Sequence, residues 1–289
     1  MSVDGSVFHK LLAVAAWLVL FSSPYFLKPY YGTFLAWIGG EFAANVYGNV
    51  LVAGITLITG NLYYYCLYRD SKYDKYRISK KPWPWNDKPD IAASFSSTLL
   101  NGFGLAVLNL VLTVPVGVGG YDLVKKLGYT ASEESFPGPL TIFWQILLFM
   151  VIEDALFYWG HRALHHPSIY GYIHKVHHRF TYSVSIAATA THPVEYFISN
   201  IVPFVAGPTL LGAHCVTLYV WVVFRQSETI TNHSGYALPW SMFSLLPFQG
   251  SATDHDLHHS KNTGNFGSLF NWWDWFCGTA LVDEGRKSK

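Results

Sequence analysis

Long runs of apolar residues constrain the fold of this chain more than any other feature. Residues 42–65, 92–118 and 139–160 form three such runs, and the first two contain no charged residue. Each is long enough to cross a bilayer as a helix, which takes about 20 residues. With 51% hydrophobic and only 13% charged residues, the chain is too apolar for an ordinary soluble domain. We therefore predict an all-α integral membrane protein.

Three shorter apolar segments are expected to add to these spans. Residues 11–21 have little positive charge before them, so an interfacial or partly inserted helix that ends at Ser22-Ser23-Pro24 is favoured over a removed signal peptide. Residues 196–226 are broken by glycine and proline near their middle, which predicts two short helices in a membrane hairpin. Residues 266–276 are rich in tryptophan and predict an interfacial helix. The total is four to five transmembrane or hairpin helices.

The charged segments predict how the chain is oriented. Residues 69–90 hold seven Lys or Arg against four Asp, and short basic loops mark the cytosolic side of a membrane. Counting crossings from this loop brings residue 160, and later residue 233, back to the same cytosolic face. The tail, residues 286–289, is similar to a dilysine-type signal for retrieval to the endoplasmic reticulum, although a solvated charged tail explains it as well. We expect N-terminal membrane helices and the basic loop in residues 1–138, and a His-rich catalytic domain in residues 139–289.

Twelve of the thirteen histidines lie between positions 161 and 259. Three groups share a helical spacing, and three further histidines stand alone. The groups are His161-x3-His165-His166, His174-x2-His177-His178 and His255-x2-His258-His259, and the lone residues are His192, His214 and His233. Imidazole is the commonest metal ligand, and helix residues three or four apart share a face. Because this is more than one ion can use, we predict a two-metal centre on the cytosolic face.

The residue pattern leaves several points open. Imidazole suits zinc, copper, iron and nickel alike, and neither a His-Glu-x-x-His nor a Glu-x-x-His motif is present to choose among them. His166 points about 100° away from His165 on a helix, so it is a ligand or a neighbour of the site. We interpret His214 as a packed core residue. A net charge near zero, without a basic stripe, argues against a nucleic-acid partner.

Carboxylates near the histidines are predicted to hold the distal ring nitrogens of the ligands. They are Asp154, Glu195, Glu228 and Asp256. The competing interpretation is structural pairing, in which Glu228 pairs with Arg225 and the neighbouring Glu153 pairs with Arg162.

The histidine groups beside membrane spans resemble the fatty acid hydroxylase/sterol desaturase superfamily of integral membrane di-iron enzymes. Residues 152–154, 169–178, 192–195, 228–236 and 271–274 are similar to its C-4 methylsterol monooxygenase branch, and the resemblance covers about residues 139–280. The chain departs from that branch at Thr189-Ala190-Thr191 and at Asp254-His255-Asp256, which leaves the substrate less defined than the metal site.

The resemblance implies two iron ions, O2, and two electrons from cytochrome b5 with its NAD(P)H-dependent reductase, at the endoplasmic reticulum membrane. It implies oxidation of the C-4 methyl group of a sterol precursor taken from the bilayer in sterol biosynthesis. The implied ligands are His161, His165, His174, His177, His178, His192, His233, His255, His258 and His259.

Three alternatives remain from the sequence. A fatty-acyl or sphingolipid hydroxylase, or a sterol desaturase, would share the same motifs. A zinc transporter is less favoured because its ligands should lie along a path inside the spans, whereas these histidines lie at or beyond span ends. A non-catalytic lipid-binding relative is less favoured because the ligand set is full.

Overall fold

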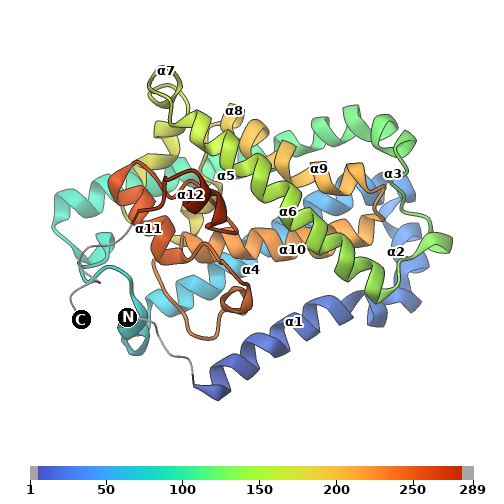
Figure 1. The fold of residues 1–289 in the computed structure, drawn as a ribbon, viewed down its shortest axis with the longest axis horizontal. Coiled ribbons are helices and arrows are strands. Elements are labelled where there is room, and N and C mark those ends of the chain that lie inside the picture. The colour runs from blue at the N-terminus through green and yellow to red at the C-terminus, as the bar shows by residue number, and fades with distance from the viewer. Residues whose placement is uncertain (1–5, 282–289) are drawn as a thin grey trace.

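The computed structural model describes residues 6–281, and within them the chain is helical, with isolated β-bridges but no strand. Five long helices form the body of the molecule (Figure 1). They are α1 (Val7–Leu27), α4 (Asn49–Tyr68), α5 (Pro89–Lys126), α6 (Pro139–Leu164) and α10 (Cys215–Asn232). The predicted all-α class is confirmed, and the tail at residues 286–289 lies outside the described residues.

Short helical segments connect these five helices. They are η1 (Lys28–Tyr30), α2 (Tyr31–Ile38), α3 (Glu41–Ala43), η2 (Ala44–Gly48), η3 (Ser71–Tyr76), η4 (Pro84–Asn86), η5 (Glu133–Ser135), α7 (Pro167–Tyr170), η6 (His174–Arg179), η7 (Ser185–Thr189), α8 (Pro193–Glu195), η8 (Tyr196–Ile201), α9 (Val202–Leu210), η9 (Met242–Leu245), α11 (Ala252–Lys261) and α12 (Trp272–Phe276). Two of them, η2 and η8, are π-helical, a rare form that is frequent at functional sites.

Four helical stretches among the described residues are long and apolar enough to cross a membrane. They are Val7–Ile38, Glu41–Tyr68, Pro89–Lys126 and Pro139–Leu164. Large apolar side chains such as Val19, Leu100 and Leu140 are exposed on them, as expected of surfaces that face lipid rather than water. The protein is therefore a multi-pass membrane protein, as its composition predicts.

The N-terminal helix is longer than predicted. It does not end at residues 22–24 but continues through Pro24 to Leu27. The hydroxyl groups of Ser22 and Ser23 donate to the carbonyl oxygens of Leu18 and Leu20, at 2.6 and 2.8 Å. These polar side chains are thus satisfied on the preceding turn and do not break the helix.

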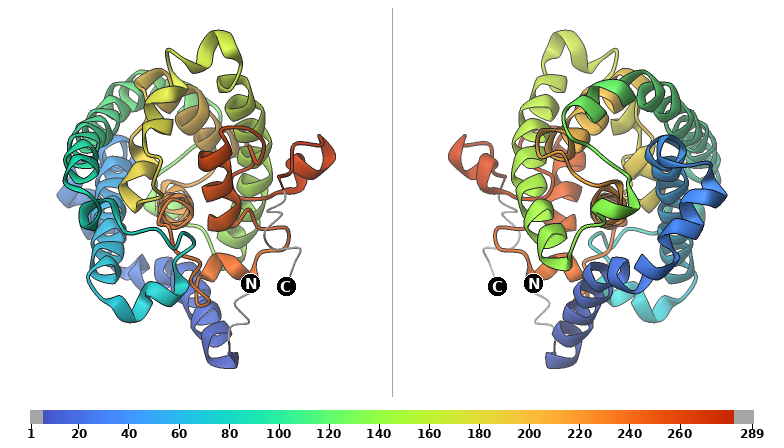
Figure 2. Two further views of the ribbon diagram at one scale, coloured as in Figure 1. Left: turned by 90° about the vertical axis from the view of Figure 1, so that its left-hand side faces the viewer. Right: turned by 90° about the vertical axis from the view of Figure 1, so that its right-hand side faces the viewer.

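The predicted hairpin forms from α9 and α10, which are joined at residues 211–214. Its second arm, α10, lies in the middle of the molecule with other helices around it (Figure 2). Most of its residues are buried, and α10 packs against both α4 and α6. The hairpin therefore forms the core of the bundle, and its contact with the bilayer stays a prediction.

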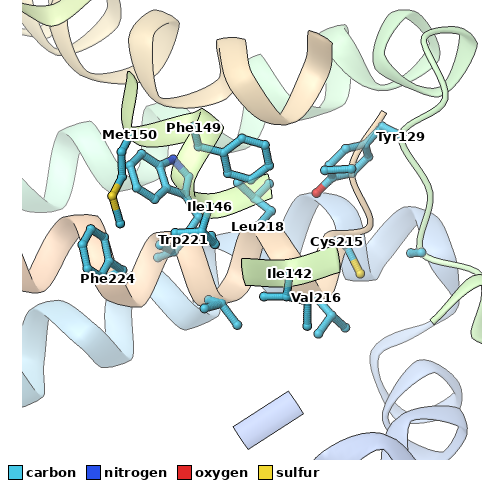
Figure 3. Packing of buried hydrophobic residues seen from close by; sticks show 14 of the residues in the cluster. Tyr129, Ile142, Ile146, Phe149, Met150, Cys215, Val216, Leu218, Trp221 and Phe224 are labelled. Carbon is cyan, nitrogen blue, oxygen red and sulfur yellow. The ribbon is translucent and has the colours of Figure 1, made fainter. Parts of the chain in front are cut away.

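Aromatic and aliphatic side chains from α6 and α10 fill this core (Figure 3). Phe149 and Trp221 meet edge to face, with ring centroids 6.0 Å apart, and Trp221 and Phe224 are stacked. The indole N–H of Trp221 donates to the carbonyl oxygen of Phe204 at 3.1 Å, which ties α10 to α9. Such contacts matter in a membrane protein because lipid is as apolar as the core, so helices associate through packing and hydrogen bonds.

A close approach of α9 to α6 gives the first testable prediction. A Cβ atom on Gly207 would lie 2.8 Å from Phe149 Cδ1 and 3.0 Å from Phe149 Cα. We expect Gly207→Ala to destabilise the protein by about 1–3 kcal/mol through overpacking, measured by thermal unfolding in detergent. Gly104→Ala is the matched control, because nothing lies within 4 Å of a Cβ atom there. An unchanged melting temperature for Gly207→Ala would contradict this packing.

The segments that carry the histidines gather at one end of the bundle, the left in Figure 1. The basic segment with η3 and η4 lies at this end, together with η6 and α11. The turns at residues 39–40, 127–138 and 211–214 lie at the opposite end. The number of membrane crossings counted from the sequence predicted that the histidine groups and the basic segment lie on the same side of the bundle, and the structure agrees.

The C-terminal helix is shorter than predicted. Only α12 is helical within residues 266–276. The carboxylate of Asp274 accepts hydrogen bonds from the backbone N–H groups of Phe266 and Gly267, at 2.8 and 2.7 Å, so the chain turns around this side chain instead of continuing a helix. Trp275 and Phe276 remain exposed on α12.

Candidate metal centre

Nine histidines from the three groups and from position 233 form two adjoining clusters. The first cluster is His161, His165, His174, His178 and His258, and the second cluster is His177, His233, His255 and His259. Within each cluster, one ring nitrogen per residue lies within 4.8 Å of all the others. The clusters touch, because the ring centroids of His178 and His259 are 4.6 Å apart.

The His-x-x-His-His spacing divides each group between the two clusters. In η6, His174 and His178 belong to the first cluster and His177 to the second. In α11 the division is reversed, since His255 and His259 belong to the second cluster and His258 to the first. Adjacent residues point about 100° apart on an α-helix and about 120° apart on a 3-10 helix, so neighbouring histidines cannot serve one ion. We expected the three histidines of each His-x-x-His-His group to share a side, and the structure corrects this, whereas His161 and His165 do lie in one cluster.

The Nε2 atoms converge at distances that suit shared metal ions. In the first cluster, Nε2 of His174 lies 3.1 Å from that of His161 and 3.0 Å from that of His178. In the second, Nε2 of His255 lies 2.8 Å from that of His233 and 3.1 Å from that of His259. Two nitrogens bound to one ion at about 2.0–2.1 Å are themselves separated by roughly 3 Å. The donor set therefore fits two first-row metal ions.

Backbone carbonyl oxygens determine which nitrogen of three rings carries the proton. The Nδ1–H groups of His161, His258 and His233 donate to the carbonyl oxygens of Phe266, Gly264 and Thr229, at 2.8, 2.7 and 2.8 Å. A carbonyl oxygen can only accept, so each of these rings has its proton on Nδ1 and a lone pair on Nε2. These lone pairs point into the clusters, which is the tautomer that metal binding requires.

Burial keeps the imidazole rings neutral. It lowers the pKa of His165 to about 3 and that of His233 to about 4. Burial also lowers the pKa of the other candidate ligands that lie outside the spans, which are His174, His177, His178, His255, His258 and His259. The rings therefore offer lone pairs, not positive charge, at neutral pH.

Of the four carboxylates predicted to hold ligand rings, Glu195 lies in that position. Its Oε1 is 2.9 Å from Nδ1 of His174, and both side chains are buried. Burial raises the pKa of Glu195 and lowers that of His174. A metal ion on Nε2 would favour the pairing of a carboxylate with an Nδ1–H group, because it makes the ring a stronger donor.

The other three carboxylates contact different partners, and the expectation for them must be corrected. Asp154 accepts hydrogen bonds from the backbone N–H of Phe270 at 2.9 Å and from the indole N–H of Trp272 at 2.6 Å, so it anchors the C-terminal segment to α6. Asp256 accepts from the hydroxyl group of Ser183 at 2.6 Å.

Glu228 takes part in a buried charge network instead of holding a histidine. Arg225 donates to Glu228 at 2.6 Å and to Glu153 at 2.9 Å. The network joins α6 to α10, and Arg225 also donates to the hydroxyl group of Ser268 at 2.6 Å. The predicted pairing of Glu228 with Arg225 is present, whereas Glu153 pairs with Arg225 and not with Arg162.

The three remaining histidines of this stretch lie outside both clusters and cap helices. Nδ1 of His192 accepts from the backbone N–H of Val194 at 3.2 Å, at the start of α8. His166 caps α7 and His214 caps α10 in the same way. His192 therefore does not join the ligands with which we grouped it. The sequence indicates the capping positions of His166 and His192, because proline follows each of them and proline favours the first position of a helix.

One cavity is lined by the clusters, and a second cavity adjoins the first. The histidine cavity is lined by rings from both clusters, among them His161, His177 and His255. The apolar chamber lies between α4, α5, α9 and α10 and encloses about 1220 Å³, its open mouth included. Ala188, Asn200 and Thr229 line both cavities, which makes these residues the boundary between them. Both π-helical segments, η2 and η8, contribute to the chamber wall.

The position of Glu195 gives a second prediction. We expect Glu195→Gln to lower metal affinity by roughly 10–100-fold, because a carboxyl group that can become ionised when a metal ion binds to His174 is lost. Metal retained during dialysis against a graded chelator measures this. Glu134→Gln, at an exposed position on η5, should leave the affinity unchanged. Equal affinity of the Glu195→Gln protein and the wild type would show that this contact does not support the site.

Together, these observations define a multi-pass membrane protein with two adjoining, largely buried histidine clusters that could hold metal ions. A family model described as fatty acid hydroxylase matches residues 146–279, which contain all nine clustered histidines. The chain belongs to the fatty acid hydroxylase family and is an oxygen-dependent oxidoreductase.

Curated relatives extend the similarity beyond the matched region. Methylsterol monooxygenase 2-2 of Arabidopsis thaliana is 32% identical over 252 residues, which cover 86% of this chain and 88% of the relative. Very-long-chain aldehyde decarbonylase GL1-8 of Oryza sativa subsp. indica is 36% identical over 220 residues, or 75% of this chain and 77% of the relative. Methylsterol monooxygenase erg25B of Aspergillus fumigatus is 41% identical over 159 residues, or 53% of each chain. No solved structure matches the chain.

Proposed function

We propose that this protein oxidises the C-4 methyl group of sterol precursors in the endoplasmic reticulum membrane. The reaction uses O2, two iron ions, and two electrons from cytochrome b5 and its reductase, and the histidine clusters face the cytosol. The observation that supports this proposal most strongly is the apolar chamber between the helices, which shares lining residues with the cavity lined by both clusters. Relatives named methylsterol monooxygenase support the choice of substrate.

The nine clustered histidines would hold the two irons. When bound, the iron pair supplies the activation of O2 for attack on an unactivated C–H bond. The backbone carbonyls of Phe266, Gly264 and Thr229 orient three of the rings, and Glu195 orients a fourth. Repeated oxidation would convert the methyl group through alcohol and aldehyde to carboxylate.

The chamber supplies the lipid side of the reaction. Its wall is built largely from apolar residues of the membrane helices, such as Ala53, Leu110 and Val222. A lipid that enters from the bilayer would exclude water and bring one end to the boundary at Ala188, Asn200 and Thr229. This placement suits a lipid oxidised at one end of its rigid ring system.

The opposite side of the first cluster reaches the protein surface. His165 lines an open hollow together with Trp159, Arg162 and His166. A water-soluble electron donor can therefore approach the first cluster without crossing the chamber. The two approaches separate the reductant from the lipid, which supports an oxygenase over a transporter.

An acyl-chain substrate is the second candidate. The similarity to a very-long-chain aldehyde decarbonylase favours it, and an acyl chain would also be accommodated by apolar walls. A fatty-acyl or sphingolipid hydroxylase and a sterol desaturase belong to the same set of alternatives.

Sterol profiling separates these candidates. The full-length chain is expressed in yeast cells that lack their own sterol C-4 methyl oxidase, and sterols and acyl lipids are analysed by mass spectrometry. We expect 4-methylsterols to fall and 4-desmethyl sterols to appear. Unchanged 4-methylsterols in cells whose membranes contain the protein, together with new hydroxylated or shortened acyl chains, would overturn the sterol assignment.

A further inference from the structure

Asn109 is a buried polar residue within a membrane-spanning helix, and it takes no part in either histidine cluster. It lies on α5 and is only 1% exposed. An amide inside a span is costly unless it has partners, so its surroundings indicate what it does. Asn109 lines the apolar chamber among residues such as Ala106 and Leu110.

Hydrogen bonds to one loop determine the orientation of this amide. Its Nδ2 donates to the backbone carbonyl oxygens of Thr191 and Thr189, at 3.0 and 3.3 Å. Since carbonyl oxygens only accept, the nitrogen must face the loop and Oδ1 must face elsewhere. Oδ1 is buried and has no hydrogen-bond partner among the described residues. A buried acceptor without a donor is unfavourable, and a ligand that donates would relieve it.

The loop that Asn109 holds lies at the boundary between the two cavities. Thr189 lines the chamber, Thr191 lines the histidine cavity, and Ala188 lines both. Asn109 therefore belongs to the part of the chamber next to the histidine cavity.

We propose that Oδ1 of Asn109 accepts a hydrogen bond from a hydroxyl group of the lipid substrate. Asn109 thereby selects lipids whose hydroxyl group neighbours the carbon to be oxidised. The 3-hydroxyl group of a sterol has this relation to C-4. This inference rests on the proposed function, and it names a specificity-determining residue outside the histidine groups.

Asn49 is a matched control within the same chamber. Its Nδ2 also donates to a carbonyl oxygen, that of Asn45, and its Oδ1 is also unpaired. It lies next to Gly48, where α4 meets Tyr219 of α10. Tyr219 is about 15 Å along α10 from Thr229, so Asn49 occupies the end of the chamber remote from the clusters.

The test compares a 4-methylsterol with its 3-deoxy analogue, using membranes that contain the full-length protein and its electron donor. We expect the wild type to favour the hydroxylated sterol by roughly tenfold in kcat/KM, the contribution of one hydrogen bond. In Asn109→Leu this preference should fall to about one. Asn49→Leu should retain it.

Several results would overturn the proposal. They are equal oxidation of both sterols by the wild type, a preserved preference in Asn109→Leu, and a lost preference in Asn49→Leu. The first of these needs no variant, so the test stands even where Asn109→Leu fails to fold. A wild type that oxidises neither sterol but does oxidise acyl lipids would overturn the proposed function together with this inference. A wild type that oxidises sterols without preference overturns the inference alone.

Discussion

Replacing His174 with alanine is expected to reduce lipid oxidation by more than roughly 100-fold, beyond the effect of losing a partner of a ligand. His174 is central to the first cluster, since its Nε2 lies 3.1 Å from that of His161 and 3.0 Å from that of His178. Its removal also leaves Glu195 without its ring partner. The measurement is product formation by mass spectrometry, normalised to the amount of protein in the membrane.

His166→Ala is the matched control for this change. His166 belongs to the same stretch of histidines, but it is exposed and caps α7 outside both clusters. We expect its metal content, unlike that of His174→Ala, to stay within about twofold of the wild type, because its ring lies outside both clusters. Comparable losses of metal in both variants would show that membership of a cluster does not identify the metal ligands.

Arg225→Met is expected to destabilise the fold by about 3–5 kcal/mol, because it leaves two buried carboxylates without their positive partner. Arg225, Glu153 and Glu228 are 6%, 3% and 0% exposed, so water cannot replace the lost contacts. Thermal unfolding in detergent, followed by circular dichroism, measures the loss. Arg162→Met is the control, because Arg162 is exposed and donates to the hydroxyl group of Tyr158, so its loss leaves no carboxylate unpaired.

A triple variant tests whether unpaired charge is the cause. Adding Glu153→Gln and Glu228→Gln to Arg225→Met removes both carboxylates, and uncharged replacements of buried ion networks are often tolerated. We expect the triple variant to recover much of the lost stability. If it melts no higher than Arg225→Met, the loss comes from packing around the guanidinium group and not from charge.

The spacing of the histidines predicted that they gather in space, but it did not predict the contacts around them. Spacing alone placed His161 with His165, and the repeated His-x-x-His-His pattern indicated more than one ion. How each group divides between two clusters depends on where η6 and α11 face one another, which local periodicity does not contain. The lone His233 joins the second cluster, whereas the equally lone His192 caps a helix.

The partners of the ligands were the least predictable part. Carboxylates near histidines in the sequence were expected to hold the rings, but three rings donate to backbone carbonyls, which every residue carries. Asp154 and Glu228 instead satisfy distant groups on the C-terminal segment and on Arg225. Sequence proximity favours local pairs, whereas a buried carboxylate pairs with whatever donor the tertiary fold brings near.

Hydropathy predicted well which segments form the membrane helices. The ends of helices were predicted less well where polar side chains determine them. Ser22 and Ser23 suggested a helix end, but their hydroxyl groups bond back to the preceding turn. The segment at 266–276 suggested one helix, but Asp274 draws the backbone around its own carboxylate. In both places, a side-chain hydrogen bond outweighs the periodicity of the apolar residues.

Metal analysis of the purified full-length protein tests the central claim most directly. Two adjoining clusters with converging Nε2 atoms predict two iron ions per chain, each bound through nitrogen, as quantified by mass spectrometry and X-ray absorption. His174→Ala and His255→Ala should each lower this value, because they remove ligands from different clusters. One ion or none in a catalytically active wild-type protein would contradict the two-metal centre.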